Sequence, residues 1–226
     1  GVLAGRKFSS VLDGYKSIRR RPMGRVVKPL SKMGAIIKAK NNNENAPIEF
    51  IGGELKNINY DMPVASAQLK SALILAGLRS KDGITINQPA FSRDHTERLL
   101  RFMGATIKTK GLKIQVMPSE INAVDVIIPG DISSAAYWLV AGSIHKNADL
   151  TIKNVGINTT RAGIINVLNR MGAKINMFNK LDYSGEPVCD INISTSNLNA
   201  TSICGEEIPL LIDEIPIIAL AAVFAE

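Results

Sequence analysis

The chain has 226 residues, of which 46% are hydrophobic and 21% charged, and a formal net charge of +7. These values indicate a folded protein of one large or two small domains and exclude disordered and collagen-like chains. The longest apolar run, residues 215–225, is shorter than the roughly 20 residues of a membrane-spanning helix, so we expect no membrane partner. Only two cysteines are present, Cys189 and Cys204, which favours a reducing, cytoplasmic location over a disulfide scaffold.

The first third of the chain begins with Leu3-Ala4-Gly5, which we interpret as the end of a helix. A basic run follows at residues 16–25, with four Arg and one Lys. The plain interpretation is a solvated turn before a helix, with Pro22 and Met23 as the first helical residues. The alternative is that Arg21, fixed next to a proline, captures a phosphate or carboxylate through its guanidinium fork. We then expect an amphipathic helix ending at residues 33–35, a strand at 35–38 and a polar loop at 41–45.

The second third repeats this order, with a helix at 66–77, a strand at 83–87, an amphipathic stretch at 99–102 and strands at 106–108 and 111–116. Ser66 is expected to cap the first helix, although a helix N-terminus with a Ser hydroxyl and the Gln68 amide is also suited to an anion. Ser92 likewise suits an N-cap, with Arg93 beside it.

The last third starts at a Pro-Gly turn, residues 129–130, where we place a domain boundary. It continues with a helix at 133–142, a strand at 149–153, an amphipathic stretch at 164–168, strands at 174–177 and 189–193, and a helix at 215–225. Asp213 precedes this last helix. N-capping is its default role, and an acid–base role is open to it if a substrate reaches it.

An internal repeat organises these elements. Met-Gly-Ala occurs at Met33, Met103 and Met171, at spacings of 70 and 68 residues. Each copy ends an amphipathic stretch and opens a strand, so the glycine is expected to be a left-handed helix C-cap. Alternating helices and strands in a repeat of about 70 residues predict an α/β fold class.

Several kinds of site have no support in the sequence. There is no G-x-x-x-x-G-K-[ST], no G-x-G-x-x-G after a strand, no H-E-x-x-H and no C-x-x-C. The two histidines, His95 and His145, have no cysteine beside them, so we expect no metal. A polyanion-binding module would fit the basic charge, but the aromatic content of 5% argues against nucleic acid as a partner.

Six segments, taken together and in order, resemble the motifs of the bacterial 5-enolpyruvylshikimate-3-phosphate synthase family. They run nearly from end to end of the chain: residues 21–26 (RPMGRV), 63–72 (PVASAQLKSA), 92–98 (SRDHTER), 129–136 (PGDISSAA), 154–158 (NVGIN) and 211–216 (LIDEIP). Ser66-Ala67-Gln68 corresponds to the members of the family with Ala in this motif.

The resemblance implies an enzyme that needs no cofactor. It would transfer the carboxyvinyl group of phosphoenolpyruvate to the 5-hydroxyl of shikimate 3-phosphate and release phosphate. In the matching motifs, Arg21 binds phosphoenolpyruvate, and Asp213 binds the 5-hydroxyl and is the catalytic proton acceptor. The remaining substrate-binding positions hold shikimate 3-phosphate: Ser66, Ala67, Gln68, Ser92 and Arg93.

The resemblance also implies an architecture of two domains built from repeated βαβαββ units, with helices inside and sheets outside. Residues 1–129 would belong to the domain that holds shikimate 3-phosphate, and 130–226 would begin a second, discontinuous domain. The family's Lys-Ser…Arg motif and its Lys-Glu…Arg segment are not in the chain. We therefore expect an internal fragment, inactive alone, of a monomeric enzyme. The alternative within the same fold is a transferase that uses UDP-N-acetylglucosamine as acceptor.

Overall fold

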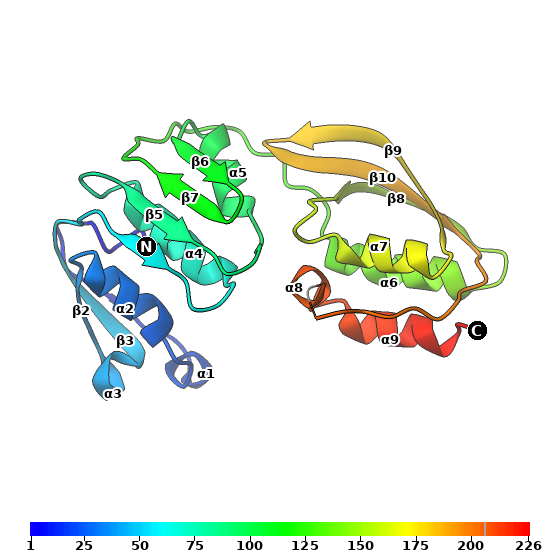
Figure 1. The fold of residues 1–226 in the computed structure, drawn as a ribbon, viewed down its shortest axis with the longest axis horizontal. Helices are drawn as coiled ribbons and strands as arrows, with labels where there is room; N and C mark the ends of the chain where they lie inside the picture. The colour runs from blue at the N-terminus through cyan, green and yellow to red at the C-terminus, as the bar shows by residue number, and fades with distance from the viewer. Residues whose placement is uncertain (206) are drawn as a thin grey trace. The chain divides into compact units, whose positions relative to one another are not determined.

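The fold is seen in a computed structural model that describes residues 1–205 and 207–226. The chain divides into two compact units, Gly1–Ala123 and Val124–Glu226 (Figure 1). The division lies six residues before the boundary expected at residues 129–130. Each unit has its own buried apolar core.

The first unit alternates short strands and helices. Its elements are β1 (Ser10–Leu12), α1 (Lys16–Arg19), α2 (Gly24–Lys32), β2 (Ile36–Ala39), α3 (Lys40–Asn43), β3 (Asn45–Gly52), β4 (Asn59–Asp61), α4 (Ala67–Gly77), β5 (Ile84–Asn87), α5 (His95–Phe102), β6 (Ile107–Lys110) and β7 (Lys113–Val116). The run from β4 to β7 is one complete βαβαββ unit, as the predicted fold class requires.

The second unit repeats that order with longer strands. Its elements are α6 (Ile132–Ile144), β8 (Asp149–Gly156), α7 (Gly163–Arg170), β9 (Lys174–Tyr183), β10 (Glu186–Ser194), α8 (Ile208–Leu211) and α9 (Ile215–Val223). Helices α6, α7 and α9 lie on one side of the sheet, and the strands form the other layer (Figure 1).

The three sheets share one topology. Their strand orders are β1-β3-β2, β4-β5-β7-β6 and β8-β10-β9, so the last strand of each sheet lies between its hairpin partner and the strand that precedes that hairpin. Strand β4 pairs in parallel with β5, and Gly130 forms a parallel bridge with Val155 at the equivalent place in the second unit. The internal repeat read from the sequence is therefore a structural repeat.

The Met-Gly-Ala turns act as predicted. Gly34, Gly104 and Gly172 follow the C-caps of α2, α5 and α7 and have φ values of +101°, +96° and +87°. Glycine reaches this left-handed region without steric cost and lets the chain leave the helix toward the sheet. The methionine before each glycine is buried or half-buried against the core of its unit.

Three predictions at helix starts are wrong. Helix α2 begins at Gly24, with Met23 at the N-cap, rather than at Pro22. The N-cap of α5 is Asp94 and not Ser92, whose hydroxyl donates instead to Gln88 Oε1 at 2.8 Å. The N-cap of α9 is Glu214 and not Asp213. At α2, for example, the Met23 N–H donates to the Glu44 carbonyl oxygen, a contact that the local sequence pattern does not reveal.

A stability prediction arises at Gly83, in the turn before β5. Its φ is +79°, and a Cβ atom there would overlap the Val116 carbonyl oxygen. Gly111 has a φ of +55° with open space around it, so it serves as the matched control. Gly111→Ala should cost about 1 kcal/mol of unfolding free energy for backbone strain alone. Gly83→Ala should lower the unfolding free energy by clearly more, because the main chain at Gly83 or Val116 must also shift to make room for the Cβ atom. Urea unfolding checks this, and equal costs would contradict it.

Candidate functional site

Arg21 lies in the turn between α1 and α2, with an exposed side chain. Its backbone is held at both ends: its N–H donates to the Ile18 carbonyl oxygen at 3.0 Å, and its carbonyl oxygen accepts from Asn45 Nδ2 at 3.1 Å. Among the described residues its guanidinium forms no ion pair, whereas the neighbouring Arg19 is paired with Asp13 at 2.5 Å. A fixed backbone and an unpaired guanidinium together suit capture of an anion from solution.

The segment at 41–45 contacts the turn that contains Arg21. A polar loop without a role was expected here, and the structure has instead most of the short α3 and the first residue of β3. Asn41, Asn42 and Asn43 have positive φ, which Asn tolerates better than other residues with a Cβ. This places the Glu44 carbonyl oxygen 2.7 Å from the Met23 N–H that donates to it, one residue from the Asn45 contact. The 41–45 turn thus positions the Arg-Pro-Met segment through its main chain.

Ser66, Ala67 and Gln68 form the N-terminus of α4. Ser66 is the N-cap, and its hydroxyl accepts a hydrogen bond from the Leu69 N–H at 3.4 Å, which confirms the predicted cap. Ser66 and Ala67 are half-buried, and Gln68 is exposed. The first turn of a helix presents backbone N–H groups and a partial positive charge, so this end of α4 is suited to an anionic group.

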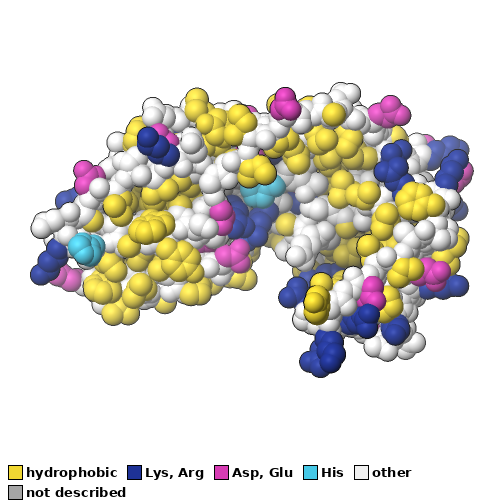
Figure 2. All heavy atoms as spheres, turned by 180° about the vertical axis from the view of Figure 1, so that it is seen from behind, with side chains coloured by type: hydrophobic (Ala, Val, Ile, Leu, Met, Phe, Trp, Pro, Cys, Tyr) yellow, Lys and Arg dark blue, Asp and Glu magenta, His cyan; other side chains and the backbone are white. Residues whose placement is uncertain are grey.

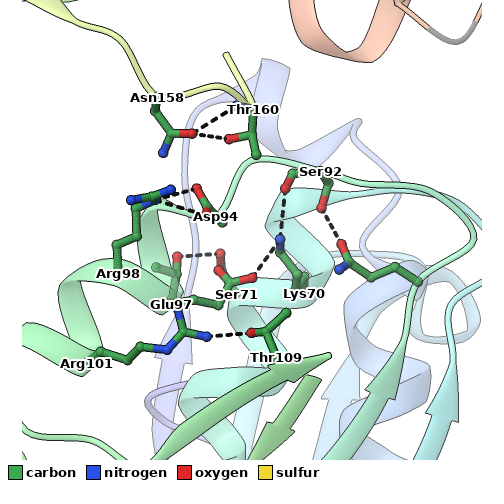
Figure 3. Close-up of polar contacts among 12 residues, drawn as sticks. Lys70, Ser71, Ser92, Asp94, Glu97, Arg98, Arg101, Thr109, Asn158 and Thr160 are labelled. Carbon is green, nitrogen blue, oxygen red and sulfur yellow. Dashed lines mark hydrogen bonds and ion pairs between the residues drawn. The ribbon is translucent and has the colours of Figure 1, made fainter. Parts of the chain in front are cut away.

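The loop with Ser92 and Arg93 is joined to this helix end by a buried lysine (Figure 3). Lys70 Nζ lies 3.1 Å from the Ser92 carbonyl oxygen, to which it donates, and 2.7 Å from Glu97 Oε1. Next to it, the hydroxyls of Ser71 and Thr96 lie 2.6 Å apart and link α4 to α5. The fold therefore brings together the two predicted segments of the first unit, 66–68 and 92–93.

In the second unit, Arg161 gathers the polar groups around Asp213. Its guanidinium lies 3.6 Å from Asp213 Oδ2 and 3.1 Å from Asp131 Oδ1, and it donates to Ser133 Oγ at 2.6 Å. The Ser133 hydroxyl donates to the carboxylate of Glu214, which is only 2% exposed. Asp213 itself is about half exposed, so its carboxylate is accessible while Arg161 holds it in place.

Asp131 caps α6, and its side chain accepts a hydrogen bond from the Ser133 N–H. Burial works to raise the pKa of its carboxyl, but the Ser133 N–H and the charge of Arg161 outweigh it and lower the pKa below the ordinary value. The carboxylate of Asp131 is therefore charged at neutral pH and holds Arg161 in turn.

Charge is divided unequally between the two units. Residues 1–123 contain 21 Lys and Arg against 9 Asp and Glu, whereas residues 124–226 contain 6 against 11. Lys and Arg side chains are seen at several places over the first unit, on the right of Figure 2. The excess of positive charge in the first unit raises the local concentration of anionic ligands there.

The predicted site residues thus lie in three places: Arg21 before α2, residues 66–68 with 92–93 between α4 and α5, and Asp213 in the second unit. Among the described residues, no hydrogen bond or ion pair joins Arg21 to the α4–α5 segments. No group of three or more His, Cys, Asp or Glu able to hold a metal is found in residues 1–205 and 207–226. Within the same residues, no helix is both long and apolar enough to span a membrane.

The sequence reasoning assigned no role to Lys70, Glu97, Arg161 or Asn45. Lys70 lies in an otherwise apolar helix, four residues after Ser66. A charged residue at such a position is the feature of the sequence that could have indicated a role for it. Arg161 and Asn45 belong to no recognisable motif, because their partners, Asp131 and Arg21, lie 30 and 24 positions away in the chain.

The whole chain, residues 1–226, matches the family model described as EPSP synthase (3-phosphoshikimate 1-carboxyvinyltransferase). Proteins named 3-phosphoshikimate 1-carboxyvinyltransferase are 50% identical in Thermoanaerobacter sp. (strain X514), over 227 residues, and in Geobacillus kaustophilus (strain HTA426), over 228 residues. In both cases the match covers 100% of this chain and 53% of the relative. The chain therefore spans about half the length of the curated relatives it matches.

Two solved structures are similar to this chain over nearly its whole length. The EPSP synthase from Acinetobacter baumannii superposes with a TM-score of 0.93 at 41% identity, covering 99% of this chain and 51% of that one. The enolpyruvyl transferase NikO from Streptomyces tendae superposes with a TM-score of 0.74 at 18% identity, covering 98% of this chain and 52% of that one. This second likeness supports the fold alone.

Proposed function

Because the chain belongs to the EPSP synthase (3-phosphoshikimate 1-carboxyvinyltransferase) family, we propose that the full-length protein carrying it transfers the carboxyvinyl group of phosphoenolpyruvate to shikimate 3-phosphate. The acceptor is the 5-hydroxyl of shikimate 3-phosphate, and phosphate is released. The reaction serves the formation of chorismate and aromatic amino acids, and we propose that it takes place in the cytoplasm on a monomeric enzyme without a cofactor. The observation that carries this proposal is the match of the family model over the whole chain.

In the proposed site, the first unit holds shikimate 3-phosphate. The N-terminus of α4, with Ser66, Ala67 and Gln68, receives its phosphate and ring, and Ser92 and Arg93 add contacts from the facing loop. The contact between Lys70 and the Ser92 carbonyl supports this map, because it holds both segments at one place. The positive charge of residues 1–123 supports it as well.

Arg21 is proposed to bind phosphoenolpyruvate, whose carboxylate and phosphate both suit a guanidinium fork. The 5-hydroxyl oxygen attacks C2 of phosphoenolpyruvate while C3 takes up a proton, which gives a tetrahedral intermediate. Loss of phosphate from C2 and of a proton from C3 then restores the double bond. The protein's part is to place the two anions and to move these protons.

Asp213 is proposed as the acceptor of the 5-hydroxyl proton. Its carboxylate is half exposed and is held by Arg161, so it is both accessible and oriented. Glu214 is less suited to this role, because it is buried and already accepts the Ser133 hydroxyl.

The proposal predicts a substrate-selective effect of Arg93→Ala in the full-length protein. A titration should show binding of shikimate 3-phosphate weakened by about 10-fold or more, since a hydrogen bond to a charged group contributes about 1.5–3 kcal/mol. Binding of phosphoenolpyruvate should change much less. Arg79→Ala, which removes an exposed positive charge just beyond the other end of α4, is the control and should leave both affinities unchanged. A larger loss for phosphoenolpyruvate than for shikimate 3-phosphate would refute the site map.

A further inference from the structure

The least expected feature of the first unit is the buried ion pair between Lys70 on α4 and Glu97 on α5. The side chains are 1% and 3% exposed, and Nζ and Oε1 lie 2.7 Å apart (Figure 3). Removing two charges from water costs several kcal/mol per ion, and their attraction offsets this only when all their polar atoms are satisfied. Here Glu97 Oε2 has no hydrogen-bond partner among the described residues. Stability alone therefore explains this pair poorly.

The lysine has a second contact that is specific. Its Nζ donates to the Ser92 carbonyl oxygen at 3.1 Å, and this oxygen belongs to the peptide bond that joins Ser92 to Arg93. The Ser92 side chain is fixed separately, through its hydroxyl and Gln88 Oε1. The segment between β5 and α5 has no regular secondary structure, and both contacts help to hold it in place.

Lys70 is also tied directly to the helix end. Its backbone N–H donates to the Ser66 carbonyl oxygen at 3.0 Å in the first turn of α4. Lys70 therefore contacts two main-chain carbonyl oxygens. Its backbone N–H donates to that of Ser66, and its ammonium group donates to that of Ser92. Only a long side chain with several donors can contact Glu97 and a carbonyl oxygen at once, which Met or Leu in the same space cannot do.

We propose that Lys70 is a positioning residue. Its ammonium group, held by Glu97, fixes the peptide bond before Arg93 so that Arg93 and the Ser66–Gln68 helix end meet the same anionic substrate. This inference rests on the proposed function, in which that substrate is shikimate 3-phosphate. Lys70 itself is buried and does not touch the substrate.

The test uses the full-length protein with both charges replaced, Lys70→Met with Glu97→Leu, because removing one partner alone would leave the other charge buried and unpaired. The control is Lys110→Met, which removes an exposed lysine from β6 of the same unit and leaves the Lys70–Glu97 pair intact. We expect the double variant to raise KM for shikimate 3-phosphate by about 10-fold or more, the effect of a lost hydrogen bond to a charged group. KM for phosphoenolpyruvate should stay within about threefold of wild type in both variants, as should KM for shikimate 3-phosphate in Lys110→Met.

Hydrogen exchange of residues 88–94 is the second measurement and needs no substrate. Exchange in this segment should be faster in the double variant and unchanged in Lys110→Met. If the apolar pair does not fold, Lys70→Gln with Glu97→Gln replaces it, because the shorter amide also loses the Ser92 contact.

Unchanged KM for shikimate 3-phosphate with unchanged exchange in a folded double variant would overturn the proposal, and so would an equal rise in both KM values. Failure of the wild-type protein to use shikimate 3-phosphate would instead contradict the proposed function. The exchange measurement would then still decide whether Lys70 holds the loop.

Discussion

Replacing Asp213 with Asn in the full-length protein is expected to lower kcat by about 10²–10⁴-fold, the usual contribution of a positioned acid–base group. The amide has nearly the shape of the carboxylate and can still accept a hydrogen bond from a hydroxyl, but it cannot take up a proton at neutral pH. KM for shikimate 3-phosphate should therefore change far less than kcat. Steady-state kinetics with both substrates measures the two effects separately.

Asp149→Asn is the matched control for this variant. Asp149 is an exposed carboxylate on β8 of the same unit that accepts from Asn192, so the same change of side chain there should leave kcat unchanged. A kcat near wild type for Asp213→Asn, or a loss confined to KM, would show that Asp213 binds substrate without moving a proton. In that case the proton acceptor would have to be sought elsewhere.

Replacing Arg21 with Ala should raise KM for phosphoenolpyruvate by about 10²-fold or more, because truncating one partner of a hydrogen-bonded charge pair costs about 2–5 kcal/mol. Arg21→Lys should give an intermediate loss, since it keeps the charge but not the planar fork. Folding should be unaffected, because the turn is held through the main-chain atoms of Arg21 by Ile18 and Asn45.

Arg20→Ala provides the control, as it removes an exposed guanidinium one position away. It should leave the KM values for both substrates close to wild type. Equal effects of Arg20→Ala and Arg21→Ala would mean that the basic run acts through its total charge. That outcome would favour the general polyanion-binding alternative over a defined phosphoenolpyruvate contact.

The α/β repeat could be predicted from the sequence because its turns are local. At Gly34, Gly104 and Gly172 a left-handed glycine closes each amphipathic helix, and the residues that fix the turn are adjacent in the chain. Strands β1 and β4 could not be predicted in this way. Each has three residues, and β4 reads Asn-Tyr-Asp, so pairing with β5 rather than any intrinsic pattern makes it a strand.

The candidate site was predictable only in part, for the same physical reason. Ser66 was correctly predicted as an N-cap, because capping depends on the next three residues. Ser92 has a similar local pattern but turns to Gln88, and its carbonyl oxygen accepts from a lysine that precedes it by 22 positions. Arg161 is likewise defined only by partners distant in the chain. Such residues become visible once the fold has brought their partners together.

The most direct test of the proposed function is the release of phosphate from phosphoenolpyruvate by the full-length protein, measured with shikimate 3-phosphate, with UDP-N-acetylglucosamine and without an acceptor. The proposed function predicts sustained release only with shikimate 3-phosphate. Equal release with UDP-N-acetylglucosamine, or none with shikimate 3-phosphate, would contradict it.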